Sequence, residues 1–421
     1  MKSIFIFLIN PFLGFLSSLA NLNKRWHGLV FVAFYSLFGY AISFTLTSAD
    51  SYRIGARFCQ QDFVFEEILG MYERGSITDV YMLMVFSIVK QYTDNPKILF
   101  AVLGAVLGGL AYLSVSQLYK IWKGKRTWFF YLILAIFMLN VAFDKVNAIR
   151  FWTATAYFSF LAIQYLYFKR RYALFLIALS PLFHFGYLIA TIGFYLFIVL
   201  KLLRVTTRMI YVLMLLTFMI NIFTPRGAIN DLMTDDEGEV EELSSNRAIG
   251  RKEQSYVKSN TNLEKHANKR SNRDMSLYRQ ANRAYTRFFG YVNKWGMIVF
   301  LSFFYVKRKK IIQDNMQMQY FKYVLFSYAI GYIAQVVILN GGRFLVLANQ
   351  LFVFWFFTVF QKNYSYRWKQ YALYLIPINF YAITFILFNV PRLVTPLLWF
   401  APPYMTIMDG IGFEPIDFIE Q

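Results

Sequence analysis

The chain has 421 residues, of which 58% are apolar and only 16% are charged, and its mean hydropathy is +0.42. Soluble domains carry about 25% charged residues, so this composition excludes an ordinary water-soluble protein and favours a membrane protein. The formal net charge is +20, but the basic residues are scattered between apolar runs, which argues against a nucleic-acid partner. The single Cys59 and three dispersed histidines give neither a disulfide framework nor a metal-ligand motif, so we expect no metal and no cofactor.

Apolar runs recur along nearly the whole chain, and many reach the length that a helix needs to cross a bilayer. We therefore predict an all-α fold, a polytopic transmembrane bundle of about twelve spans. The segment 172–200 is too long for one ordinary span, and Pro181 and His184 in its middle predict two short helices. The predicted spans are 4–20, 29–46, 98–119, 128–143, 148–167, 172–184, 185–200, 209–223, 291–306, 320–339, 344–360 and 371–388.

These spans define four segments along the chain. They are an N-terminal transmembrane bundle (1–223) with an outer loop at 47–97, a long charged loop (224–290), C-terminal transmembrane helices (291–390) and a tail (391–421). Basic residues crowd the loops on one predicted side, so the positive-inside rule places the long loop, the tail and both termini in the periplasm.

One part of the charged loop has a pattern of its own. The stretch 277–289 is rich in helix formers, and Arg279, Arg283 and Arg287 lie four residues apart on one helix face. This row of arginines suits an anionic lipid headgroup or a glycan, and a plain solvated face is the alternative.

Four ionisable residues lie near the outer membrane face in this topology, where charge is costly and calls for an explanation. Arg150 opens a span one turn after Asn147, and Arg343 follows a glycine pair between two apolar runs. His184 lies at the break in 172–200, and Asp50 ends the second span. The alternatives are membrane anchors for the arginines, a structural hydrogen bond for His184, and a helix cap paired with Arg53 for Asp50.

Two arginines, an imidazole and a carboxylate at one depth suit a reaction on an anionic, lipid-linked substrate. Guanidinium forks match phosphate oxygens and would stabilise a departing diphosphate. His184 and Asp50 are the catalytic candidates, because either could take a proton from an attacking hydroxyl. The substrate-binding candidates are Arg150, Asn147, Arg343, Arg53, Arg283 and Arg287.

The chain resembles the EpsG-like, Wzy-type polymerases of bacterial surface polysaccharides over roughly residues 30–360. The resemblance rests on short motifs: Asn147-x-x-Arg150 opening a span, the basic turn 169–171, the pair Phe183-His184, Asp50-Ser51-Tyr52-Arg53, and Arg343-Phe344 at the start of a late span.

The resemblance implies an enzyme of the bacterial inner (cytoplasmic) membrane, similar to C-type glycosyltransferases, with its active site facing the periplasm. It would transfer undecaprenyl-diphosphate-linked glycan onto another lipid-linked repeat unit at the outer leaflet, making O-antigen, capsule or exopolysaccharide. Its partners would be that lipid-linked oligosaccharide and membrane lipid, with a chain-length regulator and a flippase as further candidates. The alternatives are an O-antigen ligase or another C-type membrane glycosyltransferase, a lipid-linked oligosaccharide flippase, and a purely structural membrane subunit.

Overall fold

The computed structural model describes residues 2–44, 50–60, 80–123, 126–224, 277–312, 314–337, 341–362, 366–390 and 393–411, with positions 65, 68 and 70. These residues form helices and no strand, apart from an isolated antiparallel bridge between Ile42 and Val394. The all-helical class predicted from the sequence is thus confirmed over the described ranges. The chain divides into two compact units. Unit 1 comprises Met1–Gly70, Asp79–Leu188 and Ala382–Gln421, and unit 2 comprises Met71–Thr78 and Ile189–Tyr381.

Three stretches of the described chain are long and apolar enough to cross a membrane. They are Pro96–Ile121, Trp128–Leu166 and Arg343–Gln361. Four further apolar helices are shorter: Val80–Lys90, Tyr172–Phe183, Tyr187–Leu202 and Thr207–Phe223. These segments support a membrane protein, and the bundle of about twelve spans stays a prediction.

The N-terminal segment does not form the single span predicted at 4–20. It forms two helices of eight residues, α1 (Lys2–Ile9) and α2 (Pro11–Ser18). Asn10 between them has extended backbone and accepts a hydrogen bond from the Leu13 N–H, and Pro11 begins α2. The two helices fold back so closely that a Cβ at Gly14 would lie 2.4 Å from the Phe7 Cα. Each helix is about 12 Å long, less than half of the hydrocarbon core, so the predicted span is wrong.

The core of unit 1 is the pair α3 (Arg25–Tyr40) and α7 (Pro96–Ile121), packed backbone against backbone. A Cβ at Gly39 would lie 2.0 Å from the Phe100 carbonyl oxygen, and one at Gly104 would lie 2.4 Å from the Tyr35 carbonyl oxygen. Positions rise along α3 as they fall along α7, so the helices are antiparallel. Gly104 and Gly108 of α7 form the small-xxx-small pattern that allows such close approach in membranes.

The other described helices of unit 1 follow in chain order. The first are α4 (Asp50–Gln60), α6 (Val80–Lys90), α8 (Trp128–Asn140) and the 3₁₀ helix η1 (Phe143–Ala148). They are followed by α9 (Ile149–Leu166), α10 (Tyr172–Ile177) and α11 (Ser180–Phe183). Helix α12 (Tyr187–Leu202) starts after an interruption at His184. The break predicted within 172–200 is therefore confirmed.

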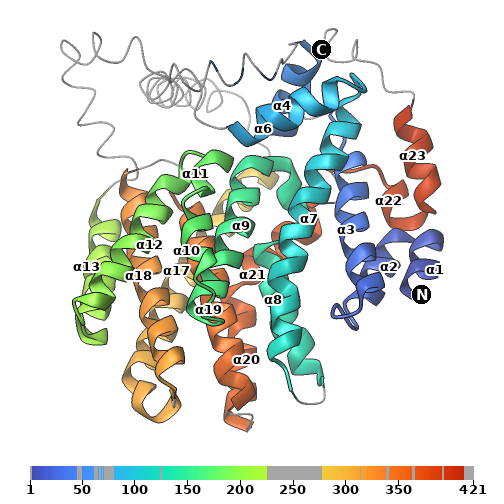
Figure 1. Ribbon diagram of the computed structural model, residues 1–421. Helices are drawn as coiled ribbons and strands as arrows, with labels where there is room; N and C mark the ends of the chain where they lie inside the picture. The colour runs from blue at the N-terminus through green and yellow to red at the C-terminus, as the bar shows by residue number, and fades with distance from the viewer. Residues whose placement is uncertain are drawn as a thin grey trace. The chain divides into compact units, whose positions relative to one another are not determined.

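The predicted C-terminal tail is folded where it is described. Helices α22 (Leu397–Phe400) and α23 (Pro403–Ile411) lie beside the N-terminal helices (Figure 1). The Asn10 side-chain amide donates to the Trp399 carbonyl oxygen at 2.8 Å, and the rings of Phe12 and Trp399 lie 5.1 Å apart. The Thr395 N–H also donates to the Ala41 carbonyl oxygen at 3.0 Å.

Unit 2 is built from α13 (Thr207–Phe223), α17 (Leu277–Ile311), α18 (Asn315–Val337), α19 (Arg343–Lys362) and α20 (Tyr366–Ile378), with most of α12. Helix α21 (Phe380–Asn389) crosses from unit 2 into unit 1. Helix α18 packs between α13 and α19, and the Trp355 indole N–H donates to the Gln317 carbonyl oxygen at 3.1 Å. Helix α17 has 35 residues, about 52 Å at the usual rise. It unites the helix predicted at 277–289 with the span predicted at 291–306.

Candidate functional site

The first contact of the candidate site joins α4 to η1. Asp50 is the first residue of α4, and the next residue, Ser51, donates its backbone N–H to the Asn147 Oδ1 at 3.2 Å. The first N–H groups of a helix have no partner within the helix, so the Asn147 amide satisfies one of them from another element. The Asp50 carboxylate also accepts a hydrogen bond from the Arg53 guanidinium, which is the pairing that the sequence spacing suggested.

Two further arginines belong to the elements of this junction. Arg150 lies in the first turn of α9, directly after η1, and Arg57 lies on α4 one turn after Arg53. Partial burial and then the positive charge of Arg150 lower the pKa of Arg57, so the two guanidinium groups lie within electrostatic range of each other. Both remain cationic, because arginine does not lose its proton in proteins. Such a pair of cations favours an anionic ligand near both.

Arg57 was not among the residues predicted from the sequence. A signal for it existed, since Arg53 and Arg57 stand four apart and share a face with Asp50 on a helix.

His184 joins the cluster through Phe151, the residue that follows Arg150. The His184 and Phe151 rings lie 5.4 Å apart and nearly perpendicular, at 81°. The His184 Nδ1 accepts the Gly186 N–H at 3.1 Å. A neutral imidazole with Nδ1 as acceptor carries its proton on Nε2 and presents a donor there.

Phe151 is itself held firmly, and this fixes the imidazole relative to α9. Its ring lies 5.2 Å from the Tyr187 ring. The Tyr187 hydroxyl donates to the Thr155 hydroxyl, which donates to the Phe151 carbonyl oxygen at 2.9 Å. These two hydrogen bonds connect the start of α12, which follows His184 in the chain, to the first turns of α9.

An ion pair between two neighbouring residues lies within η1. Asp144 is 5% exposed, and the Lys145 ammonium lies 3.2 Å from its carboxylate. The same ammonium lies 4.8 Å from the centroid of the Trp152 ring on α9. We call Asp50, Arg53, Arg57, Asn147, Arg150 and His184 the arginine–histidine cluster; all six belong to unit 1.

The remaining predicted site residues belong to unit 2. Arg343 is the first residue of α19. The turn before it requires glycine, because a Cβ at Gly341 would lie 1.8 Å from the Ala334 carbonyl oxygen. Arg283 and Arg287, like Arg279, lie on the backbone of α17, and their side chains are outside the described part of the structure.

Within the described ranges, no group of three or more histidine, cysteine, aspartate or glutamate side chains is arranged to hold a metal ion. No family model, curated protein or solved structure matches the chain.

Proposed function

We propose that the chain is a membrane glycosyltransferase that polymerises a bacterial surface polysaccharide. It acts at the outer leaflet of the inner membrane, as a multi-span protein whose active site faces the periplasm. It transfers the undecaprenyl-diphosphate-linked glycan onto another lipid-linked repeat unit.

The observation that carries this proposal is the convergence of α4, η1, the start of α9 and His184, which bring Asp50, Arg57 and Arg150 to one junction. The Ser51–Asn147 hydrogen bond joins α4 to η1, the His184–Phe151 ring contact joins His184 to α9, and the charge of Arg150 acts on Arg57. Two guanidinium groups that repel each other gain most from a ligand with two negative centres, and a diphosphate is such a ligand. A guanidinium pair used only as a membrane anchor would not need to converge.

The proposed reaction moves one glycosyl group. The acceptor hydroxyl oxygen attacks the anomeric carbon of the donor, and the bond from that carbon to the diphosphate oxygen breaks. The hydroxyl proton passes to a base, and undecaprenyl diphosphate leaves with the bonding electron pair. Arg57 and Arg150 stabilise the negative charge that develops on the leaving oxygen.

The geometry favours different roles for the two catalytic candidates. Asp50 begins α4, and the Ser51–Asn147 hydrogen bond connects this helix end to η1, so we assign the proton acceptor to its carboxylate. His184 in the neutral form presents an Nε2 donor, because Nδ1 accepts the Gly186 N–H. We assign to it a hydrogen bond to a diphosphate oxygen. Arg343, Arg283 and Arg287, which belong to unit 2, stay substrate-binding candidates predicted from the sequence.

Replacement of each cluster arginine by lysine tests the proposal. Lysine keeps the charge and reaches a membrane interface equally well, but it cannot bind two phosphate oxygens with one planar fork. Charge-assisted hydrogen bonds are worth about 1.5–3 kcal/mol each, so Arg150→Lys or Arg57→Lys should slow turnover roughly tenfold to a few hundredfold. The measurement is polymer length on a gel, from cells with the variant at wild-type membrane level.

Arg171→Lys is the matched control, because Arg171 is an exposed arginine of the predicted cytoplasmic turn 169–171. We expect single repeat units with either cluster variant and a normal ladder with the control. A normal ladder with both cluster variants would refute the diphosphate role. Normal chain lengths on the lipid carrier combined with failed transfer to a final acceptor would instead identify a ligase.

A further inference from the structure

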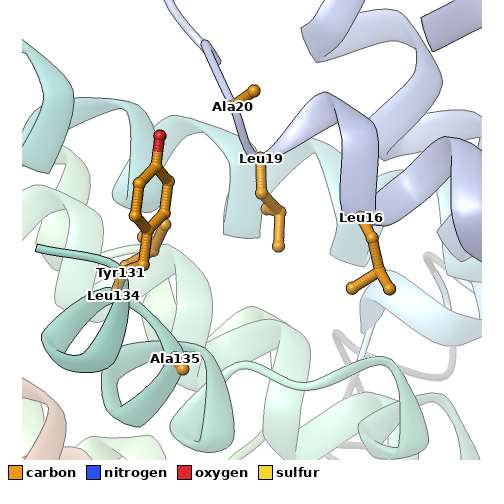
Figure 2. A pocket seen from close by; sticks show the side chains of 6 residues that line it. All are labelled: Leu16, Leu19, Ala20, Tyr131, Leu134 and Ala135. Atoms are coloured by element: carbon orange, nitrogen blue, oxygen red, sulfur yellow. The ribbon is translucent and has the colours of Figure 1, made fainter. Parts of the chain in front are cut away.

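A second feature of unit 1 is a groove between the end of α2 and the side of α8. Its volume is about 320 Å³, and its lining residues are Leu16, Leu19, Ala20, Tyr131, Leu134 and Ala135. Figure 2 shows Leu16, Leu19 and Ala20 on one side and the α8 residues on the other, with the Tyr131 hydroxyl as the polar atom of the lining side chains. A peptide backbone would lose hydrogen bonds in such a groove, whereas a hydrocarbon chain would not.

A fixed cation stands at one end of the groove. The Arg126 guanidinium donates to the carbonyl oxygen of Ala20, a lining residue, at 2.7 Å. It also lies 4.8 Å from the centroid of the Tyr119 ring. Exposed Lys24 and Lys123 belong to the same two connections, 19–24 and 122–127, and exposed Arg25 begins α3. The sequence contains no aspartate or glutamate at 1–44 or 96–143, so this end of the groove is strongly electropositive.

Aromatic side chains mark the same end as a membrane–water interface. Trp26 is 50% exposed at the start of α3, and Trp128 is 56% exposed at the start of α8. Tryptophan and tyrosine gather at the level of lipid headgroups, together with basic residues. These residues therefore place the Arg126 end of the groove at the level of the lipid headgroups.

We propose that the groove is a binding site for an anionic phospholipid. One acyl chain lies between α2 and α8, and the headgroup phosphate contacts Arg126. The two turns of α2 are too short to span the bilayer, so this lipid fills space that a full-length helix would otherwise occupy. The site is separate from the arginine–histidine cluster and stands whether or not the proposed reaction is correct.

Photolabelling of the purified full-length protein in nanodiscs tests the site. The probe is phosphatidylglycerol with a photoreactive diazirine in one acyl chain, and labelled peptides are identified by mass spectrometry. We expect enriched labelling of the peptides that contain Leu16–Ala20 and Tyr131–Ala135, relative to other exposed apolar helix faces. Uniform labelling of all these faces would overturn the proposal, and this measurement on the wild-type protein needs no variant.

Two pairs of variants test separately the binding of the acyl chain in the groove and the binding of the headgroup phosphate by Arg126. Ala135→Trp fills the groove and should remove the enrichment, whereas Val102→Trp, on the exposed face of α7, should leave it unchanged. Arg126→Gln should lower the preference for phosphatidylglycerol over phosphatidylcholine about fivefold, the effect of one basic residue near a membrane surface. Arg171→Gln removes an equal charge elsewhere and should not change it. Equal effects within either pair would refute the corresponding half of the proposal.

Discussion

At the scale of single residues, Asn147 combines a predicted functional role with an observed structural one. Its position one turn before Arg150 made it a substrate-binding candidate. In the structure its Oδ1 accepts the Ser51 N–H and so connects η1 to the start of α4. Because Asp50 directly precedes Ser51, this one contact sets where the carboxylate lies relative to Arg150.

Substitution of Asn147 should reveal this connection as a loss of stability. Asn147→Ala removes the acceptor and leaves the Ser51 N–H without it, which costs about 1 kcal/mol, as loss of a helix cap does. Asn147→Asp keeps an acceptor oxygen and should retain most of the stability. Thermal unfolding of the purified proteins in detergent measures the difference. An alanine variant as stable as the wild type would show that α4 is held by other contacts.

The thiol of Cys59 gives a second prediction at this scale. Burial raises the pKa of Cys59 to about 11, with opposing smaller effects from Lys90 and Asp94. Only the thiolate reacts with alkylating reagents, so at pH 8 a thiol of this pKa should react about a hundredfold more slowly than a free cysteine. Iodoacetamide labelling over time, before and after denaturation in SDS, checks it. Equal rates in the two conditions would contradict the raised pKa.

At the scale of the elements, the close contact between α3 and α7 predicts that a larger residue at Gly104 lowers the stability of the protein. Gly104→Ala would place a Cβ 2.4 Å from the Tyr35 carbonyl oxygen, so the helices must separate. Overpacking of this kind costs about 1–3 kcal/mol. Gly109→Ala is the matched control on the same helix, because a Cβ there meets nothing within 4 Å. Alanine should even favour the helix at that position.

Melting temperatures of the two variants in one detergent decide the question. We expect a lower value for Gly104→Ala and a value equal to or above the wild type for Gly109→Ala. Equal destabilisation by both would mean that the backbone contact is unimportant.

The elements also show what the sequence could and could not predict. Helix class and the break near His184 followed from hydropathy and from Pro181, because both are local properties. The turn between α1 and α2 was missed, although Asn10 and Pro11 are a typical start of a helix. Hydropathy averaged over a span cannot detect a turn between two helices that are both apolar. The proximity of Arg57 to the charge of Arg150 was missed for another reason, since a hydropathy profile does not show which helices lie side by side.

At the scale of the whole molecule, the distribution of basic residues predicts how the chain is oriented. The loop 224–290 and the C-terminal end should face the periplasm. A Ser259→Cys protein in a Cys59→Ser background tests this with a membrane-impermeant maleimide. Labelling in intact spheroplasts is expected. Labelling that requires a permeabilised membrane would reverse the topology and with it the proposed location of the active site.

The packing of the two ends of the chain has a consequence for biosynthesis. Asn10 and Trp399 are 389 residues apart in sequence and share a hydrogen bond. Ribosomes add about 5–20 residues per second, so the α1–α2 hairpin waits roughly 20–80 s for its C-terminal partner. During that time the apolar surface that Trp399 later covers is open to lipid or to an insertase. Nascent chains arrested before α22 should therefore be preferred substrates for membrane proteases, whereas the finished chain is protected.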